Sequence, residues 1–278
     1  MKNVKKFRGK ALLMGTVLLL SACSAGRYAA TEKIYKEKAK GFATVLSATP
    51  PEGQQIPTLD QGIQSWIGSV NFGIRKPNFV IIHHTAQDSL TQTVNTFLNA
   101  KAEVSAHYVI GRDGKVVQMV NDYLRANHAG AAKWGNDSDL NSSSIGIELD
   151  NNGKTDPFTD AQLRSLVGVL EVLKKKYNIP TANFIGHADI APGRKVDPMN
   201  FPWKVLAKKG FGFWYDDVLQ LPPENFDTTL ALRIIGYNTA NLKSAISAFK
   251  LHFVQNDNTA VLTATDKLIL FNLYKKYM

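Results

Sequence analysis

The chain has 278 residues, of which 44% are hydrophobic and 20% are charged, with 20 glycines and 11 prolines. This composition excludes a disordered, collagen-like or polytopic membrane protein and predicts a globular chain that can bury a core. The formal net charge is +10, but residues 1–22 contain five of the basic residues and no acidic one, so the rest carries +5. That modest charge suits an anionic polymer or surface. It is not clustered, so we expect no nucleic-acid partner.

The N-terminus predicts a signal peptide over residues 1–22. Basic residues precede an apolar run over 11–20, which is shorter than the roughly 20 residues of a membrane-spanning helix, and small residues follow it. The only cysteine of the chain, Cys23, comes next. The string Leu20-Ser-Ala-Cys23 resembles the bacterial lipoprotein box, whose cysteine receives acyl chains such as palmitate and becomes the new N-terminus. The alternative is a short N-terminal anchor that is not removed.

The lipoprotein resemblance implies an exported bacterial protein that Cys23 holds to a membrane, with each buried methylene contributing about 0.8 kcal/mol. Ser24, and not aspartate, follows the cysteine. This resembles the sorting rule for the outer membrane, so we expect the protein to face the periplasm from that membrane. Residues 23–62 are first rich in lysine and then in proline, without sustained periodicity. We therefore expect a tether there.

The middle of the chain alternates predicted strands and helices. The continuously apolar run over 79–83 predicts a strand buried on both faces, and residues 144–149 predict another strand. Apolar runs over 106–110 and 115–120 flank Arg112-Asp-Gly114, a pattern typical of a hairpin. These runs therefore predict two strands of a buried sheet and an antiparallel pair.

Two helices and a further strand complete this region. The first helix is predicted from Ser89 to about Lys101. The second begins after Thr159, which forms a predicted capping box with Gln162, and it ends at the lysines 174–176.

A last strand is predicted over 183–187. The order of elements predicts an α/β domain over residues 63–218, with a mixed central sheet flanked by helices. Residues 222–278 predict a small three-helix bundle, with helices over 229–235 and 241–254 and a final helix capped by Thr263 or Thr265.

Polar residues lie at or near the ends of the predicted strands, where ligands of α/β folds gather. His83, Glu148 and His187 are such residues, and Asp197 follows ten residues after the last of them. Two histidines and a carboxylate match a catalytic zinc site, which has three protein ligands and one open position. None of the spacings is a short metal motif, and a histidine at a strand end often makes a structural hydrogen bond. The residues alone leave both interpretations open.

Four strings resemble those of a known family, in the family's order. They are Val80-Ile-Ile-His-His-Thr-Ala86, Ser105-Ala-His-Tyr-Val-Ile110, Ser144-Ile-Gly-Ile-Glu148 and Gly186-His-Ala-Asp-Ile-Ala-Pro-Gly-Arg-Lys-Val-Asp-Pro198. The family is that of the zinc-dependent N-acetylmuramoyl-L-alanine amidases of the AmpD and AmiD kind, whose fold is shared with phage T7 lysozyme and the peptidoglycan recognition proteins. The resemblance spans roughly residues 64–215. It implies hydrolysis of the amide between N-acetylmuramic acid and L-alanine in peptidoglycan or muropeptides, as in cell-wall turnover.

The resemblance also implies roles for individual residues. By motif position, His83, His187 and Asp197 are the zinc ligands. Glu148 is the general base that takes a proton from water and passes it to the leaving amine. Lys195 faces the oxyanion of the tetrahedral intermediate.

Three more residues are candidates for contact with the substrate. Strand alternation sends His84 to the side opposite His83, so His84 either lines the substrate or is buried with a backbone partner. His128 lies in a string that resembles the family's Trp-His-Ala-Gly, with Asn127 in place of the tryptophan, and it is predicted to line the cleft. Arg194 is predicted to pair with carboxylates of the stem peptide through two hydrogen bonds.

Residues 236–253 resemble the peptidoglycan-binding domain that follows the catalytic domain in AmiD lipoproteins. Lys250 stands where glutamine is common, and Val-Gln follows Phe253 in place of Arg-Pro. A purely stabilising bundle is the alternative. For the whole chain, the alternative is a non-catalytic peptidoglycan-binding receptor lipoprotein, against which the presence of Glu148 and Lys195 argues. We expect a monomer.

Overall fold

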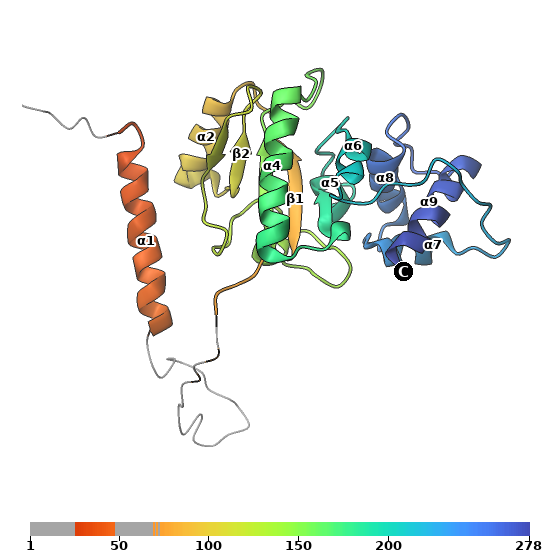
Figure 1. The fold of residues 1–278 in the computed structure, drawn as a ribbon, viewed down its shortest axis with the longest axis horizontal. Coiled ribbons are helices and arrows are strands. Elements are labelled where there is room, and N and C mark those ends of the chain that lie inside the picture. The colour runs from red at the N-terminus through yellow and green to blue at the C-terminus, as the bar shows by residue number, and fades with distance from the viewer. Residues whose placement is uncertain (1–25, 48–68, 70, 72) are drawn as a thin grey trace, which may run out of the picture. The chain divides into compact units, whose positions relative to one another are not determined.

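The computed structural model describes residues 26–47, 69, 71 and 73–278 (Figure 1). The predicted signal peptide and the predicted lipidation site Cys23 lie outside these residues. The chain divides into two compact units, Met1–Ser69 and Val70–Met278. None of the helices in the described residues has both the length and the apolar character needed to span a membrane.

The described part of the first unit contains a helix, α1 (Ala29–Ser47), where the sequence predicted only an irregular tether. No residue of α1 is buried, so the formation of this helix does not depend on packing against a core. Its alanines, lysines and glutamates are strong helix formers, and Lys33 lies 4.0 Å from Glu37 one turn away. Local propensity therefore forms this helix within the predicted tether.

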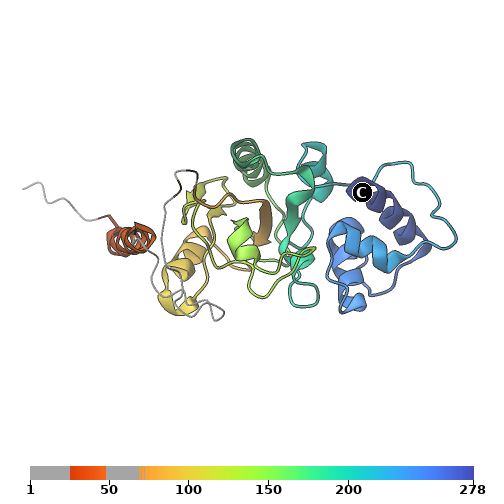
Figure 2. The same ribbon diagram turned by 90° about the horizontal axis from the view of Figure 1, so that it is seen from below.

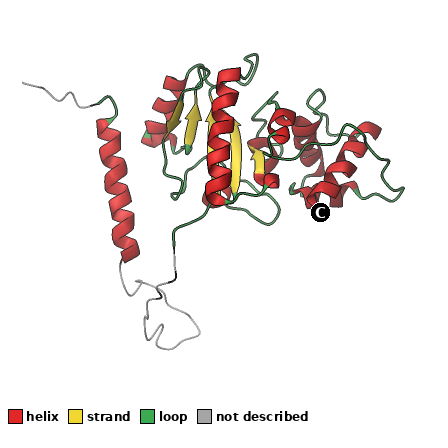
Figure 3. Ribbon diagram, viewed as in Figure 1, coloured by secondary structure: helices red, strands yellow, loops and turns green. Residues whose placement is uncertain are grey.

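The second unit is built on a five-stranded sheet, drawn in yellow in Figure 3, with strand order β3-β2-β4-β1-β5. In chain order the strands are β1 (Phe79–His84), β2 (Tyr108–Ile110), β3 (Val116–Gln118), β4 (Ser144–Leu149) and β5 (Phe184–Gly186). The pairs β1–β4, β1–β5 and β2–β4 are parallel, and β2–β3 is antiparallel. The predicted mixed α/β sheet is confirmed.

Helices lie on both faces of this sheet (Figure 1, Figure 2). The helices of the second unit are α2 (Leu90–Leu98), α3 (Leu140–Ser143), α4 (Asp160–Tyr177), α5 (His187–Ile190), α6 (Trp203–Lys208), α7 (Thr228–Ile235), α8 (Leu242–Phe253) and α9 (Ala264–Tyr277), with short 3-10 turns at Ala100–Ala102 and Thr181–Asn183. Leu166 and Leu170 of α4 share a buried cluster with Ile82 of β1. Ile81, the neighbour of Ile82, belongs to the cluster on the opposite face. Strand β1 is therefore buried on both faces, as its continuous apolar run predicts.

One predicted helix boundary and one predicted helix cap differ from the structure. Helix α2 ends at Leu98 instead of Lys101, and a 3-10 turn follows it. At the start of α4, Thr159 caps the backbone N–H of Gln162, but the Gln162 side chain does not complete the predicted capping box. That side chain instead donates to the carbonyls of Ile110 and Asp150, at 2.9 and 3.1 Å.

The last strand also ends earlier than predicted. β5 covers Phe184–Gly186, and His187 is the first residue of α5. His187 therefore lies directly after the end of β5, as the first residue of α5 and not as the last residue of the strand.

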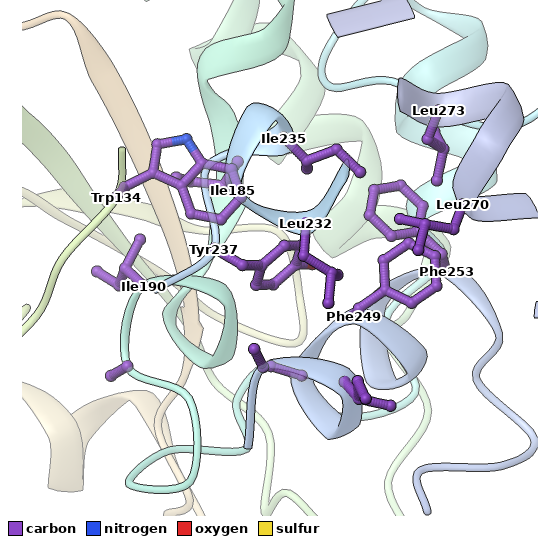
Figure 4. Packing of buried hydrophobic residues seen from close by; sticks show 14 of the residues in the cluster. Trp134, Ile185, Ile190, Leu232, Ile235, Tyr237, Phe249, Phe253, Leu270 and Leu273 are labelled. Atoms are coloured by element: carbon purple, nitrogen blue, oxygen red, sulfur yellow. The ribbon is translucent and has the colours of Figure 1, made fainter. Parts of the chain in front are cut away.

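The predicted three-helix bundle is present as α7, α8 and α9, and it shares its core with the sheet. Asp227, Asn241 and Thr263 cap the three helices through their side chains. Figure 4 shows the buried cluster that joins the two regions: Trp134, Ile185, Ile190, Leu232, Ile235, Tyr237, Phe249, Phe253, Leu270 and Leu273 are labelled. Residues 222–278 are therefore continuous with the core of the sheet region.

Candidate active site

Three side chains converge beyond the ends of β1 and β5. The Nδ1 atoms of His83 and His187 are 3.0 Å apart, and Asp197 Oδ2 lies 3.2 Å from the first and 3.0 Å from the second. All three residues are buried. The structure thus brings together the three predicted metal ligands, which are separated by up to 114 positions in the sequence.

The elements explain how these side chains meet. Along a strand, alternate side chains share a face, so His83 points to the same face as Ile81. His187 follows β5 directly at the start of α5, and the chain then turns back. The Ala188 N–H donates to the Asp197 carbonyl at 2.7 Å, which holds Asp197 beside His187.

The donor atoms have the chemistry of a metal site. His187 Nε2 lies 3.1 Å from the Ala129 carbonyl, which can only accept, so Nε2 bears the hydrogen and Nδ1 presents a lone pair. Burial, with repulsion from His187, lowers the pKa of His83 to about 4, so that imidazole is neutral at neutral pH. Burial alone would raise the pKa of Asp197, but the adjacent imidazoles hold it well below its usual range.

The spacing of the three atoms also fits a metal ion. Tetrahedral zinc with ligand bonds of about 2.0–2.1 Å places its ligands roughly 3.3 Å apart. A single hydrogen can join only two of the three atoms, whereas a divalent cation can bind all of them. Two neutral imidazoles and a carboxylate are a ligand set that zinc accepts. The site therefore fits a zinc-type ion.

Glu148 lies beside this cluster on the neighbouring strand. The parallel register of β1 and β4 pairs His83 with Glu148. Glu148 Oε2 is buried and makes no hydrogen bond within the described part of the chain. Burial and the negative charge of Asp197 raise the pKa of Glu148 to about 8, and the positive charge of Lys195 opposes that rise. Lys195 itself is exposed, on the loop between α5 and Asp197.

His84 points away from the cluster, as strand alternation predicts. Its Nδ1 accepts a hydrogen bond from the Met199 N–H at 3.2 Å, and its ring packs over Gly153. Gly153 has a φ of +69°, which favours glycine, and a side chain there would collide with the ring. The structure thus favours the buried alternative for His84.

His128 does not line an open cleft, contrary to the prediction. It is 8% exposed and lies behind His83, with its Nδ1 atom 3.0 Å from His83 Nε2. Its Nε2 lies 3.2 Å from Ser144 Oγ. Both ring nitrogens therefore face protein groups. Ser144 was not predicted to take part in the site, although it begins the same string that holds Glu148.

Arg194 also makes contacts that were not predicted. Its Nε donates to the Ala131 carbonyl at 3.1 Å and its Nη2 to the Ala129 carbonyl at 2.6 Å. The guanidinium lies over Gly130, which has a φ of +60°. The Nε–Nη2 edge of Arg194 is thus engaged with the 129–131 backbone, so it is not free for the predicted paired contact with a substrate carboxylate.

Comparisons with known proteins agree with this site. Residues 73–200 match the family model described as N-acetylmuramoyl-L-alanine amidase. The N-acetylmuramoyl-L-alanine amidase AmiD of Escherichia coli is 29% identical over 269 residues, which cover 85% of this chain and 94% of AmiD. The 1,6-anhydro-N-acetylmuramyl-L-alanine amidase AmpD of Haemophilus influenzae is 43% identical over 103 residues, 36% of this chain and 55% of AmpD. The match with that AmpD thus spans about half of its length.

Solved structures extend the similarity to the C-terminal region. A complex of E. coli AmiD with anhydro-N-acetylmuramic acid-L-Ala-D-gamma-Glu-L-Lys has a TM-score of 0.65 and 28% identity, and the match covers 76% of this chain and 93% of AmiD. AmpDh3 from Pseudomonas aeruginosa has a TM-score of 0.66 and 29% identity, over 77% of this chain and 97% of AmpDh3. Residues 73–200 therefore form a domain of the N-acetylmuramoyl-L-alanine amidase family, and the chain is homologous to the amidases AmiD and AmpD.

Proposed function

We propose that this protein is a zinc-dependent amidase that cleaves the bond between N-acetylmuramic acid and L-alanine in peptidoglycan or its muropeptide fragments. The convergence of His83, His187 and Asp197 beside Glu148 carries the proposal. The structures of AmiD and AmpDh3 with anhydromuramyl peptides support the substrate class. An amidase fits this site better than a non-catalytic receptor, because the ligands, Glu148 and Lys195 are all present.

Each residue has a separate task in the hydrolysis. His83, His187 and Asp197 hold the ion. A bound zinc ion polarises the amide carbonyl and lowers the pKa of water toward about 7. The Glu148 carboxylate, through its unpartnered Oε2, accepts the proton of the attacking water and delivers it to the leaving amine nitrogen.

Lys195 contributes positive charge at the same place. Its ammonium group opposes the rise in the pKa of Glu148, which favours the carboxylate form that the base must have. The same charge stabilises the negative oxygen that develops when the carbonyl is attacked. Both effects use a charge that is in place before the reaction begins.

The first test is digestion of purified muropeptides by the whole protein, with products identified by mass spectrometry. We expect release of the intact stem peptide with a free L-alanine amine, loss of cleavage with a chelator and its return with Zn²⁺. Glu148→Gln is expected to lower turnover by about 10²–10⁴-fold while zinc stays bound. Cleavage by Glu148→Gln at the wild-type rate would remove Glu148 as the base.

We infer further that the protein is a lipoprotein held by Cys23 to the outer membrane and facing the periplasm, as a monomer. The lipobox-like string and the serine at position 24 support this location. In cells fed a palmitate analogue we expect labelling of the wild-type protein and none of Cys23→Ser, with the labelled protein in the outer-membrane fraction. Equal labelling of both forms would contradict the anchor, and light scattering on the delipidated protein tests the monomer.

A further inference from the structure

A line of buried hydrogen bonds leads from the metal site into the protein. His83 Nε2 lies 3.0 Å from His128 Nδ1, and His128 Nε2 lies 3.2 Å from Ser144 Oγ. Ser144 Oγ in turn contacts the Leu140 carbonyl at short hydrogen-bonding distance. The four residues are between 0% and 8% exposed. Their polar atoms therefore pair with one another.

The far end of the line fixes the direction of every hydrogen bond. The Leu140 carbonyl can only accept, so the single hydroxyl hydrogen of Ser144 points to it. Ser144 Oγ must then accept the Nε2–H of His128. A neutral imidazole has one N–H, so His128 Nδ1 is left as an acceptor for the Nε2–H of His83. The remaining nitrogen of His83, Nδ1, keeps its lone pair and faces His187 and Asp197.

We propose that His128 and Ser144 are positioning residues that fix the tautomer and orientation of His83, so that its Nδ1 lone pair is ready for the metal. This inference rests on the proposed zinc site. A partner that donates or accepts at the far nitrogen of a ligand histidine typically changes metal affinity by about 10–100-fold.

The backbone holds the His128 ring in place for this task. The N–H groups of His128 and Ala129 both donate to Asn141 Oδ1, at 2.9 and 2.8 Å. The ring packs directly over Gly146, where any side chain would collide with it. Ser144 and Gly146 alternate with apolar residues on β4, so both lie on the face that carries Glu148.

One short segment thereby orients both ligand histidines. His128 accepts from the Nε2–H of His83, and the carbonyl of the next residue, Ala129, accepts from the Nε2–H of His187. Both contacts leave Nδ1 as the metal-binding atom. The Asn141 amide, by holding this segment, acts on both ligands at once.

The test compares two variants of nearly equal shape. In His128→Asn, Oδ1 can take the place of Nδ1 and accept from His83, whereas His128→Leu fills the same space without an acceptor. We expect the leucine variant to bind Zn²⁺ about 10–100-fold more weakly, in competition with a chromophoric chelator, and the asparagine variant to keep most of the affinity. Ser144→Ala should weaken binding less than His128→Leu, because His128 keeps its place but loses its fixed tautomer.

Two further measurements report on His83 and the metal site directly. In the metal-free protein, imidazole ¹⁵N shifts are expected to show His83 as the Nε2–H tautomer in the wild type and as a mixture in His128→Leu. The absorption spectrum of the Co²⁺-loaded protein should change in His128→Leu and be restored in His128→Asn. Equal losses in the asparagine and leucine variants, or an unchanged tautomer in His128→Leu, would overturn the inference. If the wild type binds Zn²⁺ but cleaves no muropeptide, the proposed function fails while the positioning role stands.

Discussion

Glu148 experiences opposing influences because it lies in a buried position between an aspartate and a lysine. Burial and Asp197 favour its protonated form, and Lys195 favours the carboxylate. The pKa of about 8 belongs to the protein without metal. A divalent cation held by the three ligands adds positive charge nearby, which lowers the pKa of Glu148 and prepares it to act as a base.

The raised pKa makes a prediction about the metal-free protein. Between the ordinary pKa of 4.5 and the folded value of about 8, the unfolded chain releases the Glu148 proton while the folded chain keeps it. The stability that the neutral carboxyl group provides is fully present below pH 4.5 and is lost as pH rises, by about 1.4 kcal/mol per pH unit. Glu148→Gln cannot lose a proton, so its advantage in unfolding free energy over wild type should grow from pH 5 to pH 8. Urea denaturation with a chelator measures this, and a constant difference would contradict the raised pKa.

At the scale of secondary structure, Gln162 fastens α4 to the sheet. Its side-chain amide donates to the carbonyls of Ile110, at the end of β2, and Asp150, just beyond β4. The amide nitrogen of this buried side chain is thereby satisfied, whereas its Oε1 makes no hydrogen bond within the described residues.

Gln162→Met, a change of similar size, is expected to lower the unfolding free energy by about 1 kcal/mol, because the buried Asp150 carbonyl loses its side-chain donor while the Ile110 carbonyl keeps that of the Asp150 N–H. Glu171→Met, at an exposed position of the same helix, is the control and should change little. Equal effects of the two substitutions on urea denaturation would rule out the role of the amide.

Most elements could be predicted from the sequence because each carries its own periodicity or cap. The strand around His83 is almost continuously apolar and the strand around Glu148 alternates apolar residues with Ser144, Gly146 and Glu148, and their parallel pairing follows from the α/β order. Helix α1 was missed: its lysine-rich sequence was interpreted as a tether, and none of its residues is buried. His187 was assigned to a strand because no pattern distinguishes a strand end from the first residue of a four-residue helix.

The site could be predicted only in part. Asp197 lies on a loop, where periodicity gives no position, so the resemblance alone supplied it. His128 lies on a loop and Ser144 begins β4, 16 residues later. Their contact depends on how the loop packs against the strand, and no sequence spacing predicts it. The contacts of Arg194 with the backbone likewise depend on the path of the 129–131 segment.

At the scale of the whole second unit, the C-terminal bundle reaches the helix that begins with His187. Asp189 of α5 is 1% exposed and accepts three hydrogen bonds, each of 2.7 Å: from the Gly186 N–H, from the Tyr237 hydroxyl and from His252 Nδ1. His252 also stacks on Trp203 at 4.0 Å between ring centroids. These contacts support a stabilising role for the bundle, and binding of peptidoglycan by it stays a prediction.

Asp189→Ala is expected to destabilise the protein by about 3–5 kcal/mol, because it leaves His252 and Tyr237 buried without their partner. Tyr237→Phe should cost less, since it removes one neutral hydrogen bond and leaves the Asp189–His252 pair intact. Asp217→Ala, on an exposed side chain, is the control. Thermal unfolding of the metal-free proteins measures how strongly each of the three substitutions destabilises the fold. A small effect of Asp189→Ala would contradict the prediction that the contacts of the bundle stabilise α5.

The pairing of His83 with Glu148 in adjacent parallel strands has a consequence for the tolerance of this enzyme to sequence change. Neighbouring strands lie about 4.7–4.9 Å apart whatever side chains they carry, because backbone hydrogen bonds set that distance. The spacing between the backbone positions of His83, a predicted metal ligand, and Glu148, the proposed base, is thus set by the peptide backbone itself. Substitutions on the surface, in loops and even in the hydrophobic core can accumulate without changing this spacing between the two strands.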